Sequence, residues 1–496
     1  MEKVEFKLTN PQKSIWLTDQ MYPDMPIENI CGSVFIEEKV NFIELENAIN
    51  LFVGKNDSFR IKLTKDKNEI LQYVDEFKPF KVDKINLNNE NEASVVEKGL
   101  VSKTFSIFNT FLFEFKMFEF PDGKGGFTIN AHHLISDAWT AGLVVNEIMD
   151  FYAEFINAKP KEEVEFPSYK DYINSEKEYL ISDRFRKDKE YWENLYINNL
   201  EIAKIPSVKE KVTNKLECQA NRKQFNISRE IINEINKFCS QKKVSIFNFF
   251  MAIYSIYIGK VSNLQEFVVG TPILNRTTYK EKHTTGMFIS TVPFKVQLKS
   301  GCSFSNFISE VARESLAMLR HQKYPYQYLL ETLRKKDNSI PNLYDILISY
   351  QNVRSDKQTS IIHFHSRWIS NECLSDGMNI HLYDMNDTGS LDVAYDYLVS
   401  KYDDIYIENI HARIIHMIEQ VLKNNEILLE SIDIVTPEEK QKIIYDFNNT
   451  AFNYDKTETV ANLFEKQVNK SPDSIALVFE NRTMTYRELN ERANSL

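Results

Sequence analysis

Two adjacent histidines are the residues of this chain best suited to chemistry. His132 and His133 lie in the string AHHLISDAW, residues 131–139, and Asp137 follows four residues after the second histidine. An imidazole can take up a proton near neutral pH, which suits the activation or positioning of a nucleophilic amine. Asp137 could fix the loop through a salt bridge and leave the imidazole aimed at a substrate.

Other interpretations of the pair stay open at this point. The two histidines could end a strand without any function. A metal site needs further ligands, and no other His-rich or acidic cluster in the sequence supplies them. A nucleophilic triad lacks support because the chain has no G-x-S-x-G sequence and no suitable cysteine neighbourhood. Acid/base chemistry is the interpretation that these residue types favour.

A strand and a helix must position the histidines. The run GFTINAHH (126–133) alternates as a strand after a turn at DGKGG (122–126). Residues 136–155 have the pattern of a strong helix, with Ser136 or Asp137 as its cap. The pair therefore stands where a strand ends and a helix begins, a place that functional residues often occupy.

The rest of the pattern predicts two halves of similar content. A helix expected over residues 245–262 is almost wholly apolar and must be buried. Further helices are expected over residues 9–22, 42–56, 304–322 and 406–424, with a polar helical connector from about 160 to 200. Strands are expected over residues 32–38, 59–65, 69–75, 110–120, 266–273, 290–298, 344–353 and 390–398. This content indicates a pseudo-symmetric, two-lobe α/β protein.

The composition excludes several functions. The 496 residues suggest two or three domain-sized units, and a formal net charge of -11 gives no electrostatic reason to bind nucleic acid or an anionic membrane. Five cysteines without a C-x-x-C pair, together with an N-terminus that lacks a signal peptide, indicate a cytoplasmic protein with reduced thiols. No apolar run is long enough to span a bilayer, and no glycine-rich phosphate loop occurs.

The character of the chain changes after about residue 435. A polar segment with little periodicity leads into residues 463–496, whose pattern predicts helix, strand, turn and helix. The sequence stops inside that last helix, without a terminator. We therefore expect a first lobe over residues 1–175, a second lobe over 176–435, and a linker with the start of a further domain over 436–496.

A series of motifs resembles the condensation domains of nonribosomal peptide synthetases, which belong to the chloramphenicol acetyltransferase-like superfamily. HHLISDA is similar to the HHxxxDG motif of that family. The other similar segments, in chain order, are LTNPQKSIW (8–16), NDSFRIKL (56–63), YKDYI (169–173), VVGTPILNRT (268–277), TGMFISTVPF (285–294), LRHQKYPYQYLL (319–330) and YDILISYQN (344–352). The segment ALVFENRTMTYRELNERANSL (476–496) resembles the first core motif of an adenylation domain.

The resemblance implies a fold and roles for single residues. The fold would be two chloramphenicol acetyltransferase-like lobes that form a V-shaped pseudo-dimer with a central tunnel. His133 matches the catalytic histidine, and His132 matches a more structural one. Asp137 matches an aspartate that pairs with an arginine across the lobes, and Arg276 occupies the position of that arginine.

Three more positions follow from the resemblance. Ala138 stands where the family has glycine; alanine resists some backbone geometries, and its methyl group narrows the space beside the histidine. This difference puts the rate or the acceptor size in doubt. Trp139 and Asn352 are expected to line the substrate tunnel.

The implied reaction joins an acyl thioester to an aminoacyl group on a peptidyl carrier protein. His133 would accept a proton from the attacking ammonium, or position the amine. No intrinsic cofactor or metal is expected, because phosphopantetheine arms or CoA carry the substrates. The expected partners of this monomer are a downstream peptidyl carrier protein, an acyl-CoA or acyl carrier donor supplied in trans, and a continuous adenylation domain, with no nucleic acid and no membrane.

The donor and the rival functions are narrowed by smaller features. The motifs begin within about ten residues of Met1, so the donor is expected in trans. Details of residues 8–30 and 320–330 also resemble starter condensation domains, which take a fatty acyl group. The alternatives are a condensation domain fed in trans with a peptidyl donor, a catalytically silent recruitment module of the same fold, and a stand-alone acyltransferase; transfer to an aminoacyl-loaded carrier would separate them.

Overall fold

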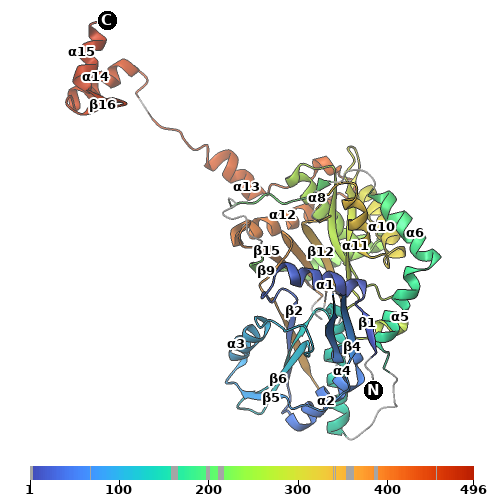
Figure 1. The fold of residues 1–496 in the computed structure, drawn as a ribbon. Helices are drawn as coiled ribbons and strands as arrows, with labels where there is room; N and C mark the ends of the chain where they lie inside the picture. The colour runs from blue at the N-terminus through green and yellow to red at the C-terminus, as the bar shows by residue number, and fades with distance from the viewer. Residues whose placement is uncertain are drawn as a thin grey trace. The chain divides into compact units, whose positions relative to one another are not determined.

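The computed structural model describes residues 4–67, 69–157, 166–196, 201–209, 217–338, 340, 342–352, 362–384, 389–453 and 455–496. The chain forms two compact units, Met1–Ile434 and Val435–Leu496, and each is described by itself. The larger unit is built on two mixed sheets with helices around them, in agreement with the predicted α/β class (Figure 1).

The first sheet has five strands in the order β13-β2-β7-β6-β5. Four of these strands come from the first part of the chain: β2 (Asn29–Ile36), β5 (Asp83–Asn86), β6 (Phe113–Glu119) and β7 (Gly125–His132). The glycines predicted to form a turn lie in the β6–β7 hairpin, and a Cβ atom at Gly126 would stand 1.8 Å from the Val34 carbonyl oxygen. The glycine therefore permits close strand packing.

Helices and a small sheet complete the first half. The helices are α1 (Asn10–Met21), α2 (Phe42–Lys55), α3 (Glu90–Val101) and α4 (Ala138–Asn157), and the small sheet contains β1 (Glu5–Lys7), β4 (Glu69–Val74) and β3 (Ile61–Asp66). The predicted helices over 9–22, 42–56 and 136–155 are found with ends shifted by one or two residues. The capping box that Thr9 and Gln12 form explains where α1 begins.

The fifth strand of the first sheet comes from far along the chain. β13 (Phe364–Ile369) pairs antiparallel with β2, with Trp368 opposite Gly32. A Cβ atom at Gly32 would lie 2.5 Å from the Trp368 ring, so glycine makes room for that indole. The sequence pattern did not predict this strand. The boundary expected between the two lobes at residue 175 stays a prediction. A division of the chain at that residue would not separate the two sheets, because residues 364–369 belong to the first sheet.

The second sheet has seven strands. Its main path is β11-β10-β12-β14-β15-β9, and β8 pairs with β10. The strands are β8 (Glu201–Ile202), β9 (Ala220–Ile227), β10 (Glu266–Ile273), β11 (Ser290–Gln297), β12 (Ile346–Gln351), β14 (Met378–Tyr383) and β15 (Leu391–Leu398). β14 alternates strictly: Met378, Ile380 and Leu382 are buried in the core, and the residues between them are partly exposed. One face of this sheet is thus apolar and the other polar.

Helices cover the apolar face of the second sheet. They include α7 (Arg229–Lys242), α8 (Ile246–Ser262), α10 (Phe304–Arg320), α11 (Tyr326–Arg334) and α12 (Asp404–Lys423). As predicted, α8 is buried, and Phe249–Ile258 contribute to the large core cluster. The predicted polar connector contains α5 (Tyr169–Leu180) and α6 (Asp183–Leu195), while residues 158–165 and 197–200 of it lie outside the described residues.

A search of the described helices for membrane spans finds none that is long and apolar enough by itself. The consecutive pair α7 and α8 passes the length and composition test jointly, with a bend of 103° between them.

The smaller unit begins with α13 (Pro437–Gln441) and contains α14 (Val460–Lys470), the hairpin β16 (Ile475–Phe479) and β17 (Arg482–Thr485), and α15 (Tyr486–Asn494). The predicted order of helix, strand, turn and helix is found, with a second short strand after the turn. Leu477, Val478 and Phe479 of β16 are 48%, 69% and 72% exposed. A strand with so much exposed apolar surface is typical of a fold that needs further partners.

Candidate functional site

His132 is the last residue of β7 and is tied into the protein on two sides. It is 2% exposed, its Nδ1 accepts a hydrogen bond from the Leu134 backbone N–H at 3.1 Å, and its Nε2 lies 3.5 Å from Asp19 Oδ1 of α1. The ring also meets Phe105 edge to face. These contacts fit the predicted structural role, because they fix the backbone turn that follows β7.

His133 is half-buried, and its environment keeps the imidazole neutral. Its backbone N–H donates to the Glu28 carbonyl at 2.8 Å, and its Nδ1 has no hydrogen-bond partner among the described residues. Burial lowers the pKa of His133 to about 4, and the nearby His132 adds to this shift, while the charge of Asp137 and a polar contact with the Ser136 backbone oppose it. At neutral pH the ring can accept a hydrogen bond from a substrate.

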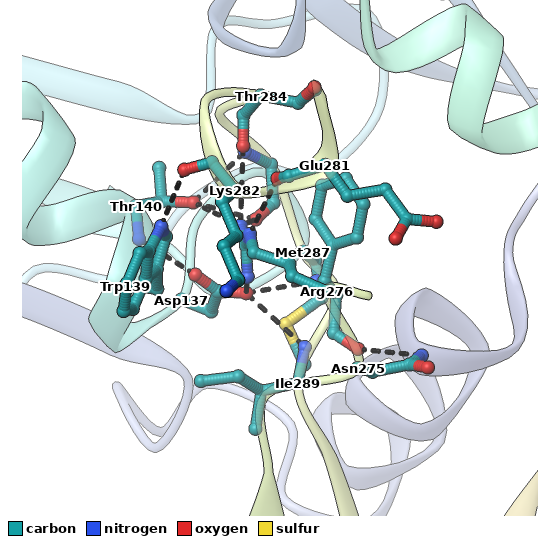
Figure 2. A network of polar contacts seen from close by, with 12 residues as sticks. Asp137, Trp139, Thr140, Asn275, Arg276, Glu281, Lys282, Thr284, Met287 and Ile289 are labelled. Atoms are coloured by element: carbon teal, nitrogen blue, oxygen red, sulfur yellow. Dashed lines mark hydrogen bonds and ion pairs between the residues drawn. The ribbon is translucent and has the colours of Figure 1, made fainter. Parts of the chain in front are cut away.

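Asp137 caps α4 and forms a buried ion pair with Arg276 (Figure 2). Arg276 Nη1 lies 2.6 Å from Asp137 Oδ2, and both side chains are 0% exposed. Asp137 Oδ1 accepts from the Thr140 N–H at 2.8 Å, which caps the helix, and Oδ2 accepts from the Phe288 and Ile289 N–H groups at 2.9 and 3.2 Å. Burial raises the pKa of Asp137, but Arg276 and these donors outweigh it and hold the pKa below its usual value.

Arg276 fills its remaining hydrogen-bonding capacity inside the protein. It donates to Thr140 Oγ1 at 2.9 Å and to the carbonyls of Gly286 and Glu281 at 3.1 Å each. Its guanidinium also lies 4.0 Å from the centre of the Phe288 ring. The structure thus brings the predicted partners together, and their contacts tie the start of α4 to the loop that precedes β11. Both side chains are fully buried, so neither is exposed to a substrate.

A pocket of about 340 Å³ lies beside His133. Its wall from the first half includes Ala138, Ala141 and Gly142 of α4, and its opposite wall is formed by the polar face of the second sheet. Ala138 is the first residue of α4 and does not have a positive φ, so its backbone shows none of the strain expected where glycine is required. Ala138 lines the pocket beside His133.

A second pocket, of about 400 Å³, brings the two predicted tunnel residues together. Trp139 and Asn352 both line it, although they are more than two hundred positions apart in sequence. Trp139 Nε1 donates to the Lys282 carbonyl at 2.8 Å (Figure 2). Gly142 of α4 lines both pockets.

Several residues of the first pocket were not predicted from the sequence. Glu28 is 7% exposed, and burial raises the pKa of its carboxyl group to about 8, with the charge of Asp19 adding to the shift. Arg222, His381 and Asp396 line the opposite wall. The alternation of polar and apolar residues along β14 could have indicated a polar wall, but nothing in the sequence showed that it would face His133.

Comparisons with known proteins point to one family. Residues 2–444 match the family described as "Condensation domain". Surfactin synthase subunit 1 of Bacillus subtilis (strain 168) is 30% identical over 500 residues, which is 99% of this chain and 14% of that protein. Gramicidin S synthase 2 of Brevibacillus brevis is 24% identical over 503 residues, which is 100% of this chain and 11% of that protein. The chain therefore spans less than a fifth of these relatives.

Solved structures show the same fold. The starter condensation domain of rhizomide synthetase in complex with C8-CoA aligns with a TM-score of 0.77 and 19% identity, over 87% of this chain and 98% of its own. The first condensation domain of the calcium-dependent antibiotic synthetase aligns with a TM-score of 0.76 and 15% identity, over 87% and 99%. The predicted α/β fold class is thereby confirmed.

Proposed function

Because this chain belongs to the condensation-domain family, we propose that it transfers an acyl group from a thioester to the amine of an aminoacyl carrier protein, with His133 at the reacting centre. Condensation domains of nonribosomal peptide synthetases catalyse amide-bond formation, an acyl-transfer reaction. The observation that carries the proposal for this chain is the position of His133, a half-buried residue at the wall of a pocket that both sheets line.

The low pKa of His133 favours positioning over proton abstraction. In the reaction the amine nitrogen attacks the thioester carbonyl carbon, the C–N bond forms and the C–S bond breaks, and the departing thiolate takes up the proton that the amine nitrogen loses. An α-ammonium group has a pKa of about 8, and burial lowers the pKa of His133 below its ordinary value, so the imidazole is a weak acceptor for the ammonium proton. His133 instead accepts a hydrogen bond from the neutral amine, and this bond directs the lone pair of the amine nitrogen at the carbonyl carbon.

The buried pair of Asp137 and Arg276 acts on the reaction indirectly, through the position of His133. Both side chains form hydrogen bonds to other residues of the protein, and Asp137 lies four residues after His133, where it caps α4. They are positioning residues that hold the His133 loop and the start of α4 in register with β11. His132 is also a positioning residue, because its ring is held by the Leu134 backbone N–H and by Asp19.

The donor and the partners are inferred from the relatives. The starter condensation domain with C8-CoA supports a fatty acyl donor that is carried on CoA or on the phosphopantetheine of an acyl carrier protein. The synthetase relatives support a peptidyl carrier protein as acceptor. Residues 436–496 are proposed to begin an adenylation domain, because β16 exposes apolar side chains that a complete domain would cover. A peptidyl donor is the alternative to the fatty acyl donor.

Acyl transfer to a leucyl-loaded carrier protein from octanoyl-CoA, followed by mass spectrometry, tests the function. His133→Ala is expected to lower the rate by at least about 100-fold, because the amine loses its alignment. His363→Ala is the matched control, since His363 is exposed, its imidazole pairs with the surface residue Glu38, and it does not line the pocket beside His133. Equal product from His133→Ala and the unaltered chain would remove His133 from the reaction; no product from the unaltered chain with fatty acyl or peptidyl donors would favour a silent recruitment module.

A pH–rate profile separates positioning from proton abstraction. For positioning, the rate falls below about pH 8 as the amine becomes protonated, and His133→Gln keeps the same pH dependence at a reduced rate. A limb near pH 6.5 that disappears in His133→Gln would show that the imidazole titrates as a base.

A further inference from the structure

The wall that faces His133 across the pocket consists of paired polar residues on adjacent strands. Asn379 of β14 is in register with Asp396 of β15, and Asp396 is in register with Arg222 of β9. Two residues further along β14, His381 is in register with Ser349 of β12. Because side chains at paired positions lie on the same face of a sheet, these residues form one polar surface.

Hydrogen bonds fix the charges of this wall. Arg222 Nε and Nη2 donate to the two oxygens of Asp396 at 2.6 and 2.7 Å, and His381 Nε2 lies 3.3 Å from Asp396 Oδ2. Ser349 Oγ and His381 Nδ1 are 2.7 Å apart, which orients the imidazole. Burial raises the pKa of Asp396, but Arg222 and His381 outweigh it and hold the pKa well below its usual range. The pair is therefore ionised, and its charges sum to zero.

Two residues of the wall keep hydrogen-bonding capacity that the protein does not use. A guanidinium has five N–H donors; Arg222 directs two of them at Asp396 and also meets the Tyr383 hydroxyl, which leaves donors for a ligand. Asn379 lines the pocket, and its Oδ1 is buried without a partner among the described residues. A buried polar atom without a partner is costly, and in native proteins such an atom commonly has a functional explanation.

The charges decide which substrate chain suits this wall. A plain alkyl chain would cover Arg222 and Asn379 and leave both without partners. A charged group of either sign is disfavoured, because Arg222 and Asp396 neutralise each other and leave no net charge to compensate it. A neutral hydroxyl or amide matches both residues, since each group can accept from Arg222 and exchange a hydrogen bond with Asn379. Ile30, Ile369 and Trp368, which also line the pocket, accommodate the apolar remainder of such a chain.

We propose that Arg222 and Asn379 form a specificity subsite that selects a substrate chain with a neutral hydroxyl or amide group over an alkyl chain of the same length. The inference rests on the proposed function, because it takes the pocket beside His133 to hold part of a substrate. The oxygen-bearing group can belong to the acyl donor or to the aminoacyl acceptor, and the chemistry of recognition is the same.

Calorimetric binding to the complete 496-residue chain tests the subsite without turnover. The donor arm compares octanoyl-CoA with hydroxyoctanoyl-CoA. The acceptor arm compares the N-acetylcysteamine thioesters of leucine and asparagine, whose side chains have nearly the same shape. In one arm the oxygen-bearing probe is expected to bind about tenfold more tightly or better, because its partners in the pocket are otherwise left unpaired.

Asn379→Leu is the diagnostic variant, because Asn379 Oδ1 has no partner to lose among the described residues. In Asn379→Leu the oxygen-bearing probe is expected to bind no more tightly than the apolar probe, so the ratio of the two affinities falls to about one or below. Arg222→Gln is expected to lower the same ratio. Gln224→Leu is the control: Gln224 lies on the same face of β9, is exposed, and does not line the pocket. Tryptophan fluorescence on unfolding confirms that each variant folds.

The outcomes are distinguishable from those of the proposed function. Equal affinities in both arms, no binding in either arm, or a preference that Asn379→Leu leaves intact would overturn the subsite. Product formed without any preference removes the subsite and leaves the acyl transfer standing. A preference that depends on Asn379, with no product under turnover conditions, supports the subsite and contradicts the proposed catalysis.

Discussion

Removing Arg276 should be among the most destabilising single substitutions in the larger unit. Arg276→Met keeps the approximate length of the side chain and deletes its charge, while Asp137 stays buried with three backbone N–H donors from Thr140, Phe288 and Ile289. Breaking one partner of a buried ion pair costs about 3–5 kcal/mol of unfolding free energy. The three remaining donors still stabilise the carboxylate, so we expect about 3 kcal/mol for this site.

A double-mutant cycle isolates the interaction. Asp137→Leu leaves the guanidinium buried with only carbonyl and hydroxyl partners, including Thr140 Oγ1 at 2.9 Å, and should cost a similar amount. The Asp137→Leu/Arg276→Met chain contains neither charge, so its loss should be well below the sum of the two single losses, with a coupling of about 2 kcal/mol or more. The reason is that most of each single loss is the uncompensated charge left behind.

Urea unfolding followed by tryptophan fluorescence is the assay. All 4 tryptophans, Trp16, Trp139, Trp192 and Trp368, lie in Met1–Ile434, so the signal reports on that unit alone. Lys7→Met is the matched control, because its ion pair with Glu69 has side chains 66% and 52% exposed, and solvent screens such a pair so that it contributes little to stability. A loss below about 1 kcal/mol for Arg276→Met, or additive losses in the double variant, would refute the reasoning.

Two further predictions concern pH and the pocket. Burial lowers the pKa of both His133 and His411 to about 4. Their ordinary value is about 6.5, so each of these two histidines makes the folded chain less stable as the pH falls from 6.5 towards 4, whereas buried carboxyl groups with a raised pKa, such as Glu28, act in the opposite direction. The histidine contribution is therefore read as a difference: His411→Phe should gain stability relative to the unaltered chain as the pH falls from 7 to 4, measured by urea midpoints, and a constant difference across that range would contradict the assignment. Ala138→Gly should cost about 1 kcal/mol or less of stability, because glycine is less favourable at the first turn of α4. It should also lower KM for bulky acceptors in the acyl-transfer assay, since the methyl group lines the pocket, and equal KM values would show that this methyl does not limit acceptor size.

The sequence predicted elements well where a single periodicity was strong. The helix from Ile246 to Ser262 and the strand ending at His132 were predicted within one or two residues, because apolar periodicity and capping act locally. The motif that carries His133 and Asp137 also placed both residues at the junction of β7 and α4. Local pattern drew attention to the histidine pair, and the resemblance to condensation domains was needed to choose His133 as the candidate catalytic residue.

Features that depend on distant contacts could not be predicted from pattern. The strand β13 (Phe364–Ile369) has polar residues, and its partner β2 is more than three hundred positions earlier, so no local signal fixes the pairing. The partnership of Asp137 with Arg276 followed only from the resemblance. The polar wall of Arg222, Asn379 and Asp396 depends on the register of three strands, and register is a property of the folded sheet.

The strand β13 has a practical consequence for anyone who divides this protein. It covers the edge of β2, a strand whose residues from Gly32 to Ile36 are all buried. A fragment that ends near residue 175 would contain β2 without that cover, and an open, apolar strand edge recruits strands from other molecules. Such a fragment should precipitate when it is expressed alone and should be rescued by a separately supplied piece that carries residues 362–371. The peptide that restores solubility would then identify the segment of the second half that covers β2.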